Sequence, residues 1–145
     1  MNTQEFVFKF NQTFLLSSDE VTQKLSQASG WEAKFRQLML LGKSLPTFPL
    51  ELQQDEYQVQ GCESNVWLLH AWREEKLLLA CSSDAKIIKG LIFVLLAALN
   101  NKTRQEILDF DLDGYFETLQ LMGQLSPSRT NGLHAIVQKI RTFVN

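Results

Sequence analysis

The 145-residue chain has few of the residues that metal, redox and phosphate sites need. It contains two cysteines, Cys62 and Cys81, and two histidines, His70 and His134. No CxxC or HExxH motif occurs, and no pair of these residues has the spacing of zinc ligands. The stretch "LGKS" (41–44) lacks the upstream glycine of a phosphate-binding loop. We therefore expect no metal and no bound cofactor.

Long apolar runs and a strong charge of one sign are absent too. The most apolar run, residues 90–99, is about half of the ~20 residues that a membrane-spanning helix needs. The first residues, "MNTQEFVFKF", lack the basic segment and apolar core of a secretory signal. The formal net charge of −2 gives no sign of a nucleic-acid or membrane partner. These features predict a cytoplasmic protein whose thiols stay reduced.

What is present suits one folded domain. Hydrophobic residues make up 45% and charged residues 21%, which is ordinary for a globular protein. A chain of this length buries roughly 70% of its unfolded surface and holds a core without disulfides. Residues 1–29 predict a helical or loosely packed N-terminal lead-in, with Ser18 capping a brief helix. Residues 30–145 predict a single domain.

The first regular pattern is helical. Apolar residues at helical spacing predict a helix over residues 31–45 that ends at the prolines of "LPTFPLEL". Its expected polar side carries Lys34, Gln37 and Lys43. The stripe that we expect to face the core is Trp31, Phe35, Leu38, Gly42 and Leu45.

A β pattern follows in the middle of the chain. "EYQVQ" (56–60) is strand-like, and "NVWLLHAW" (65–72) is rich in β-branched and aromatic residues. "REEK" (73–76) predicts a turn and "KLLLACS" (76–82) the returning strand. The pattern indicates a hairpin with Cys62 in the loop before its first long strand.

Helical patterns return after residue 84. Residues 85–99 are apolar almost all round, which predicts a buried central helix capped by Ser83 or Asp84. Asp113 is the expected start of a later short helix. The fold class predicted by these elements is α+β, a small antiparallel sheet covered by helices on one face.

Two further helix starts have clear signals. Thr103 and Glu106 have capping-box spacing. Ser126 and Pro127 fit the cap and first position of a last helix. The apolar stripe of that last helix is Leu133, Ile136, Val137, Ile140 and Phe143.

Cys62 stands out because it follows Gly61 in a turn instead of lying within an apolar run. Gly61 allows a positive φ or a tight turn that holds the sulfur at a surface. The alternative is a buried thiol that acts as a small hydrophobe, and the local sequence leaves both open. Glu63 does not favour the reactive thiolate, which needs cationic support. A Cys–His hydrolase would need His70 or His134 beside Cys62, but a structural role is the simpler reading of each.

The roles of two other residues, Cys81 and Arg129, also have to be interpreted from their positions. Cys81, within an apolar strand, is expected to fill the core or an edge. Arg129 lies in the first turn of the last helix, where the helix dipole disfavours a cation. It is either a solvated charge or a charge placed for a partner or for the Cys62 loop.

Taken together, four segments resemble the SufE family of sulfur-acceptor proteins. They are "WEAKFRQLMLLGKSLP", "GCESNVWL", "SSDAKIIKGLIFVLL" and "LSPSRTNGL", and the resemblance covers nearly all of the chain after residue 31. Within the family the chain is most similar to the CsdE branch, although "FDLDGYFETLQL" is closer to SufE itself. Glu63 departs from the "GCQS" of some members, and Cys81 has no counterpart in the motif.

The resemblance implies a function. Family members bind a pyridoxal-phosphate (PLP)-dependent cysteine desulfurase of the CsdA or SufS type and accept its persulfide sulfur. Carried over to this chain, the acceptor is Cys62. Gly61, Ser64, Asp84 and Arg129 match the motifs around it and imply a role in shaping the loop or the docking surface. The implied fold is similar to that of the IscU iron–sulfur scaffolds.

The resemblance also implies a destination. The sulfur then passes to a downstream acceptor, an iron–sulfur cluster assembly scaffold or a tRNA-modifying enzyme. Such a protein is a sulfur-transfer partner of the desulfurase instead of a stand-alone enzyme. A regulatory adapter that activates the desulfurase by binding alone is the alternative.

Overall fold

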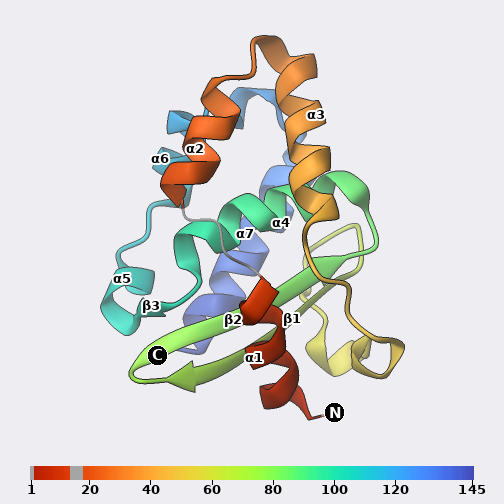
Figure 1. Ribbon diagram of the computed structural model, residues 1–145, viewed down its shortest axis with the longest axis vertical. Coiled ribbons are helices and arrows are strands. Elements are labelled where there is room, and N and C mark those ends of the chain that lie inside the picture. Colours follow the sequence, from red (N-terminus) through yellow and green to blue (C-terminus); the bar gives the residue numbers. More distant parts are fainter. Residues whose placement is uncertain (1, 14–17) are drawn as a thin grey trace.

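The structure is a computed structural model that describes residues 2–13 and 18–145. The α+β class is confirmed: an antiparallel sheet of order β1-β2-β3 is surrounded by helices (Figure 1). The strands are β1 (Val66–Arg73), β2 (Lys76–Ser83) and β3 (Lys102–Thr103). The α-helices are α1 (Thr3–Thr13), α2 (Ser18–Ser26), α3 (Gly30–Lys43), α4 (Lys86–Leu99), α5 (Arg104–Leu108), α6 (Leu112–Thr118) and α7 (Pro127–Thr142).

The hairpin β1–β2 is formed as predicted. Its pairing runs from Val66 opposite Ser83 to Arg73 opposite Lys76. Glu74 and Glu75 make the two-residue turn with φ values of 52° and 66°, the conformation that matches the twist of a hairpin. The expected strand "EYQVQ" is wrong. Asp55–Tyr57 form a 3₁₀ turn, and only Gln58 makes an isolated bridge, to Trp67.

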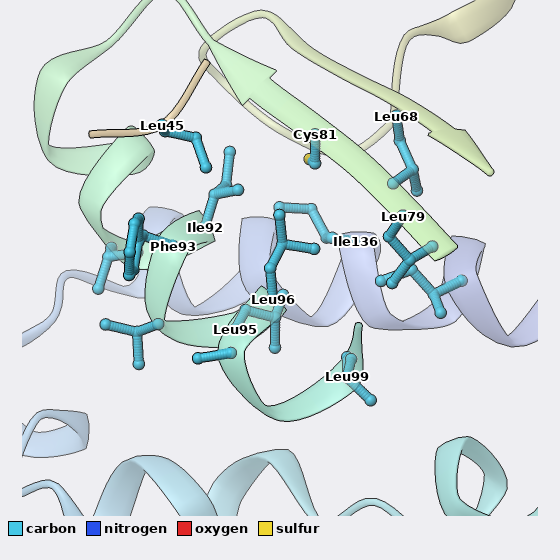
Figure 2. Packing of buried hydrophobic residues seen from close by; sticks show 14 of the residues in the cluster. Leu45, Leu68, Leu79, Cys81, Ile92, Phe93, Leu95, Leu96, Leu99 and Ile136 are labelled. Carbon is cyan, nitrogen blue, oxygen red and sulfur yellow. The ribbon is translucent and has the colours of Figure 1, made fainter. Parts of the chain in front are cut away.

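Helix α4 lies at the centre of the core, as its apolar composition predicts. Ten of its residues are buried, and it packs against α3, β2 and α7. Figure 2 shows Leu68, Leu79 and Cys81 of the hairpin facing the helix side chains Ile92, Leu96 and Ile136. One face of the sheet is therefore covered by α4 and α7.

Helix α1 adds cover that the sequence did not suggest. It contacts both long strands and lies in front of the hairpin in Figure 1, with α7 behind. Phe6 of α1 packs edge-on against Phe48, with ring centroids 4.8 Å apart. Residues of β2 on both of its faces are consequently buried. The N-terminal residues thus belong to the core, and the division between residues 29 and 30 stays a prediction.

Helix α3 differs from expectation on its polar side. The stripe residues Leu38, Gly42 and Leu45 are buried as predicted. Gly42 packs closely against α4, because a Cβ added to Gly42 would lie only 2.7 Å from the backbone nitrogen of Gly90. Lys34, however, is buried instead of exposed. Its ammonium reaches carbonyl groups at the ends of two other helices, which the local pattern does not reveal.

Of the five predicted helix starts, the described residues test four, and two of these are confirmed. Thr103 forms the full capping box with Glu106, and Ser126 accepts a hydrogen bond from the Arg129 amide ahead of Pro127. The cap of α4 is Ala85 instead of Ser83 or Asp84. The cap of α6 is Asp111. The predicted start, Asp113, is therefore the second residue of the helix. Ser18 is the first residue of α2, and the residue before it lies outside the described part.

The helices are too short or too polar to cross a bilayer. In residues 2–13 and 18–145, none has both the length and the apolar character of a membrane span.

Candidate functional site

The Cys62 loop connects the 3₁₀ turn at residues 55–57 to β1. Its ends are tied together at the base, where the Val59 amide donates to the Val66 carbonyl at 2.9 Å. Gly61 has a φ of 93°. Residues other than glycine rarely adopt this conformation. The turn thus places Cys62 beyond the paired base of the loop, as the Gly61–Cys62 sequence predicts.

The Cys62 side chain rests against the first turns of α7. Its thiol donates a weak hydrogen bond to the carbonyl of Gly132, with the sulfur 3.6 Å from the oxygen. A Cβ on Gly132 would lie 3.5 Å from that sulfur, so the absence of a side chain leaves room for the thiol. This contact joins residues 70 positions apart in the sequence.

A small pocket of about 20 Å³ adjoins the thiol, which is room for about one water-sized group. It brings together residues from the loop, the start of β1, α4 and α7. Two of the predicted site residues, Ser64 and Arg129, line it with Cys62. The other lining residues are Glu63, Val66, Ile88, Ser128, Gly132, Leu133 and Ile136.

The pocket makes the resting thiol less acidic. Cys62 is half-buried, and this burial raises its pKa above the ordinary value because a thiolate loses solvation there. The thiol form, which donates to Gly132, is therefore favoured at rest.

Asp84 acts on the base of the loop. Its Oδ2 accepts a hydrogen bond from Asn65 Nδ2 at 2.9 Å, and Asn65 Oδ1 accepts one from Gln58 Nε2 at 2.6 Å. Asn65 thus connects both ends of the Cys62 loop to the segment between β2 and α4. Asp84 does not line the Cys62 pocket, so this geometry relates it to loop shape and not to the sulfur.

The second cysteine occupies a different environment. Cys81 is fully buried in β2, opposite Leu68, as its apolar surroundings predict. Burial strongly raises its pKa, and the nearby Cys62 raises it further. Both cysteines are free thiols.

The histidines do not complete a nucleophilic site. His70 stacks on Phe143, with ring centroids 3.8 Å apart. His134 pairs with Asp113, its Nε2 3.1 Å from Oδ1. Neither lines the Cys62 pocket, so the arrangement does not support a Cys–His hydrolase. The described part of the chain also contains no group of three or more metal-ligating side chains.

Sequence reasoning missed Asn65 and Gly132. Asn65 lies within "GCESNVWL" and Gly132 within "LSPSRTNGL", so the segments that were singled out do contain them. Their roles depend on contacts with Asp84 and Cys62. No local periodicity or spacing marks such contacts.

Comparison with known proteins identifies the family. The SufE family model, described as an Fe-S metabolism associated domain, matches residues 19–144. The chain belongs to the SufE family. One relative in it is the sulfur acceptor protein CsdE of Escherichia coli (strain K12), which is 36% identical over 126 residues and 86% of each chain. The predicted similarity to the SufE family and its CsdE branch is thus confirmed.

A solved structure supports the fold. The solution structure of a hypothetical protein from Thermus thermophilus matches this SufE-family chain with a TM-score of 0.69. The match covers 90% of this chain and 96% of that one, at 16% identity. At this identity the likeness concerns the fold alone.

Proposed function

We propose that this chain is a sulfur acceptor that takes persulfide sulfur from a PLP-dependent cysteine desulfurase onto Cys62. Its membership of the SufE family and its similarity to a protein named as a sulfur acceptor support this function. The single observation that carries the choice of residue is the position of Cys62. Its thiol lies on a glycine-containing loop beside a small pocket, whereas Cys81 is sealed in the sheet.

The transfer step is a thiol–disulfide type of exchange. Cys62 first loses its proton to solvent or to a base of the donor. Its thiolate attacks the outer sulfur of the donor persulfide, a new S–S bond forms, and the donor cysteine leaves with the electron pair as a thiolate. One cysteine is sufficient for this step, which agrees with a chain that has no CxxC pair.

The resting and reacting positions of Cys62 differ in this proposal. At rest the pocket beside α7 holds the thiol in its protonated form. Docking to the desulfurase moves the loop outward, where the thiolate forms and reacts. When the loop returns, the pocket protects the added sulfur from other thiols. Gly61 provides the turn, and Asp84 restrains the loop base through Asn65.

Ser64 and Arg129 are proposed to shape the pocket. Arg129 is the cation that lines it together with Cys62. A cation near a sulfur favours its anionic form, which suits a persulfide at this position. Ser64 lines the loop side of the same pocket.

The later steps form the finer part of the proposal. Sulfur passes from Cys62 to an iron–sulfur cluster assembly scaffold or to a tRNA-modifying enzyme. This takes place in the cytoplasm, where thiols persist, by protein–protein contact without direct nucleic-acid or membrane binding. The formal net charge of −2 is compatible with partners of this kind.

A regulatory adapter that stimulates the desulfurase by binding alone is the second candidate. The two functions separate in an assay of sulfide release by a cysteine desulfurase with a thiol reductant present. If Cys62 carries the sulfur, Cys62→Ala loses the stimulation that the wild type gives, and Cys81→Ala keeps it. Stimulation that persists with Cys62→Ala, shown to be folded, contradicts the carrier function and favours the adapter.

A further inference from the structure

A second pocket is lined by residues from the end of α2, the start of α3 and the end of α6 with the segment after it. Figure 1 shows where these helices lie in the fold. Its volume is about 490 Å³, within the range of roughly 300–1,000 Å³ typical of small-molecule sites. Hydroxyl and amide side chains line much of it, among them Ser26, Ser29, Gln120 and Gln124. It shares no lining residue with the Cys62 pocket, so the proposed sulfur transfer does not account for it.

Lys34 gives this pocket a buried positive charge. Its side chain is only 8% exposed, and it lines the pocket beside Leu119. The ammonium lies 3.4 Å from the Leu25 carbonyl oxygen and 3.3 Å from that of Leu119, both long for hydrogen bonds. Across residues 2–13 and 18–145, no carboxylate lies within the 4.0 Å of an ion pair with Lys34.

Two carbonyl acceptors do not satisfy all the hydrogen-bond donors of this ammonium group, and they do not neutralise its charge. An ammonium group has three N–H donors, and buried charges in proteins are normally paired with an opposite charge. The carbonyls of Leu25 and Leu119 lie at the C-terminal ends of α2 and α6, where partial negative charge suits a lysine. They supply no full negative charge, so an anion in the pocket would find an unpaired cation.

The N-terminus of α3 also borders the pocket, through Ser29 and Gly30. Ser29, the N-cap of this 14-residue helix, makes no side-chain cap hydrogen bond. The amide groups of a helix's first turn and the positive pole of its dipole attract anions. Gly30 has a φ of 81°, and a Cβ built on it would meet no atom within 4 Å. The backbone there is open to a ligand.

The residue that follows the end of α6 also lines the pocket. Gln120 has a φ of 58°, a left-handed conformation that is uncommon for residues other than glycine. Here it ends α6 in a Schellman motif, in which the Gln120 amide donates to the Glu117 carbonyl at 2.9 Å and the Leu121 amide to the Phe116 carbonyl at 3.0 Å. This cap places Gln120 among the residues that line the pocket.

We propose that this pocket binds a small molecule through an oxyanion, a carboxylate or phosphate group that pairs with the Lys34 ammonium and the first-turn amides of α3. The hydroxyl and amide side chains around it would hold the polar remainder of the ligand. This site is separate from Cys62, so its existence does not depend on the sulfur-acceptor function.

The test is a titration of the full ¹⁵N-labelled chain with inorganic phosphate and, separately, with acetate, followed by NMR at constant ionic strength. We expect one of them to shift the amide signals of Gly30 and Gln120 and the indole signal of Trp31 in a saturable manner. Phosphate binding alone assigns a phosphate ligand, and acetate binding alone assigns a carboxylate ligand. The absence of saturable shifts with both anions overturns the proposal.

Variants identify the cation. Lys34→Met is expected to weaken binding at least tenfold, whereas Lys43→Met, on the exposed side of the same helix, leaves it unchanged. Equal binding by both variants overturns the assignment to Lys34. If Lys34→Met does not fold, Gln120→Glu replaces it and places a competing carboxylate in the pocket. We expect Gln120→Glu to weaken anion binding tenfold, while Gln105→Glu on α5 does not, and unchanged binding in Gln120→Glu overturns the proposal.

Discussion

Cys62 and Cys81 show two ways in which the same fold can place a thiol. Cys81 is enclosed in the middle strand of the sheet with no exposed surface. Cys62 lies on a loop whose ends are hydrogen-bonded to each other and whose thiol makes a weak hydrogen bond to α7. Burial raises both pKa values, strongly for Cys81. The comparison shows that Cys62 needs less of the structure to move than Cys81 does before its thiol is free to react.

The largest expected effect is the contrast in thiol alkylation. Cys62 needs only a local loop movement to react with iodoacetamide, whereas Cys81 needs the sheet to open. Because the unfolded fraction of a native protein is about 10⁻³ or less, we expect Cys62 to react at least about 100-fold faster. Peptide mass mapping of the alkylated protein measures both rates. Comparable rates in the folded protein would remove the distinction between the two thiols.

The second effect concerns stability at alkaline pH. Burial raises the pKa of Cys81 and also that of Tyr115. The unfolded chain therefore ionises these groups first, near pH 8.5 for a cysteine, and the free energy of unfolding falls as pH rises. Each group contributes a slope of up to about 1.4 kcal/mol per pH unit.

Cys81→Ala isolates the cysteine part of that slope. In a Cys62→Ala background, urea unfolding between about pH 8 and about pH 10 is expected to show a shallower loss of stability after Cys81→Ala. The stability that depends on Cys81 is fully present below about pH 8.5 and is lost above it. Equal slopes with and without Cys81 would mean that this thiol is not protected by burial.

The third effect is on the turn that presents Cys62. Gly61→Ala forces a side chain into a conformation with φ of 93° and brings its Cβ within 3.3 Å of the Ala135 Cβ. We expect a destabilisation of about 1–2 kcal/mol and slower sulfur uptake. Gly123→Ala is the matched control because nothing lies within 4 Å of its Cβ position. A Gly61→Ala protein with normal stability and uptake would show that the turn does not depend on glycine.

The smallest effect is on the loop base. Asp84→Ala removes the hydrogen bond to Asn65, and the loss of one exposed bond is expected to speed Cys62 alkylation by about two- to fivefold. Cys81 should react as before. Glu117→Ala, at another exposed carboxylate, is the control. An unchanged Cys62 rate would mean that Asp84 does not restrain the loop.

Local patterns predicted much of this molecule. The "REEK" turn, the apolar run of α4 and the caps at Thr103 and Ser126 depend on neighbouring residues, and the structure has all of them. The Gly61–Cys62 pair likewise predicted a turn at this point, and Gly61 has a φ of 93°.

What the patterns missed depends on contacts between distant segments. Lys34 is buried because it meets Leu119, 85 positions away. Gly132 contacts Cys62 across 70 positions. The second covered face of the sheet likewise comes from α1, whose apolar residues do not reveal what they pack against. Spacing within one segment carries no information about such partners.

The central claim is that transferred sulfur resides on Cys62. The most direct measurement is mass spectrometry without reductant after incubation with an active cysteine desulfurase and free cysteine. We predict a mass gain of one sulfur atom that maps to the Cys62 peptide, persists in Cys81→Ala and disappears in Cys62→Ala. An unmodified Cys62 with several active desulfurases, or sulfur that maps to Cys81, would contradict it.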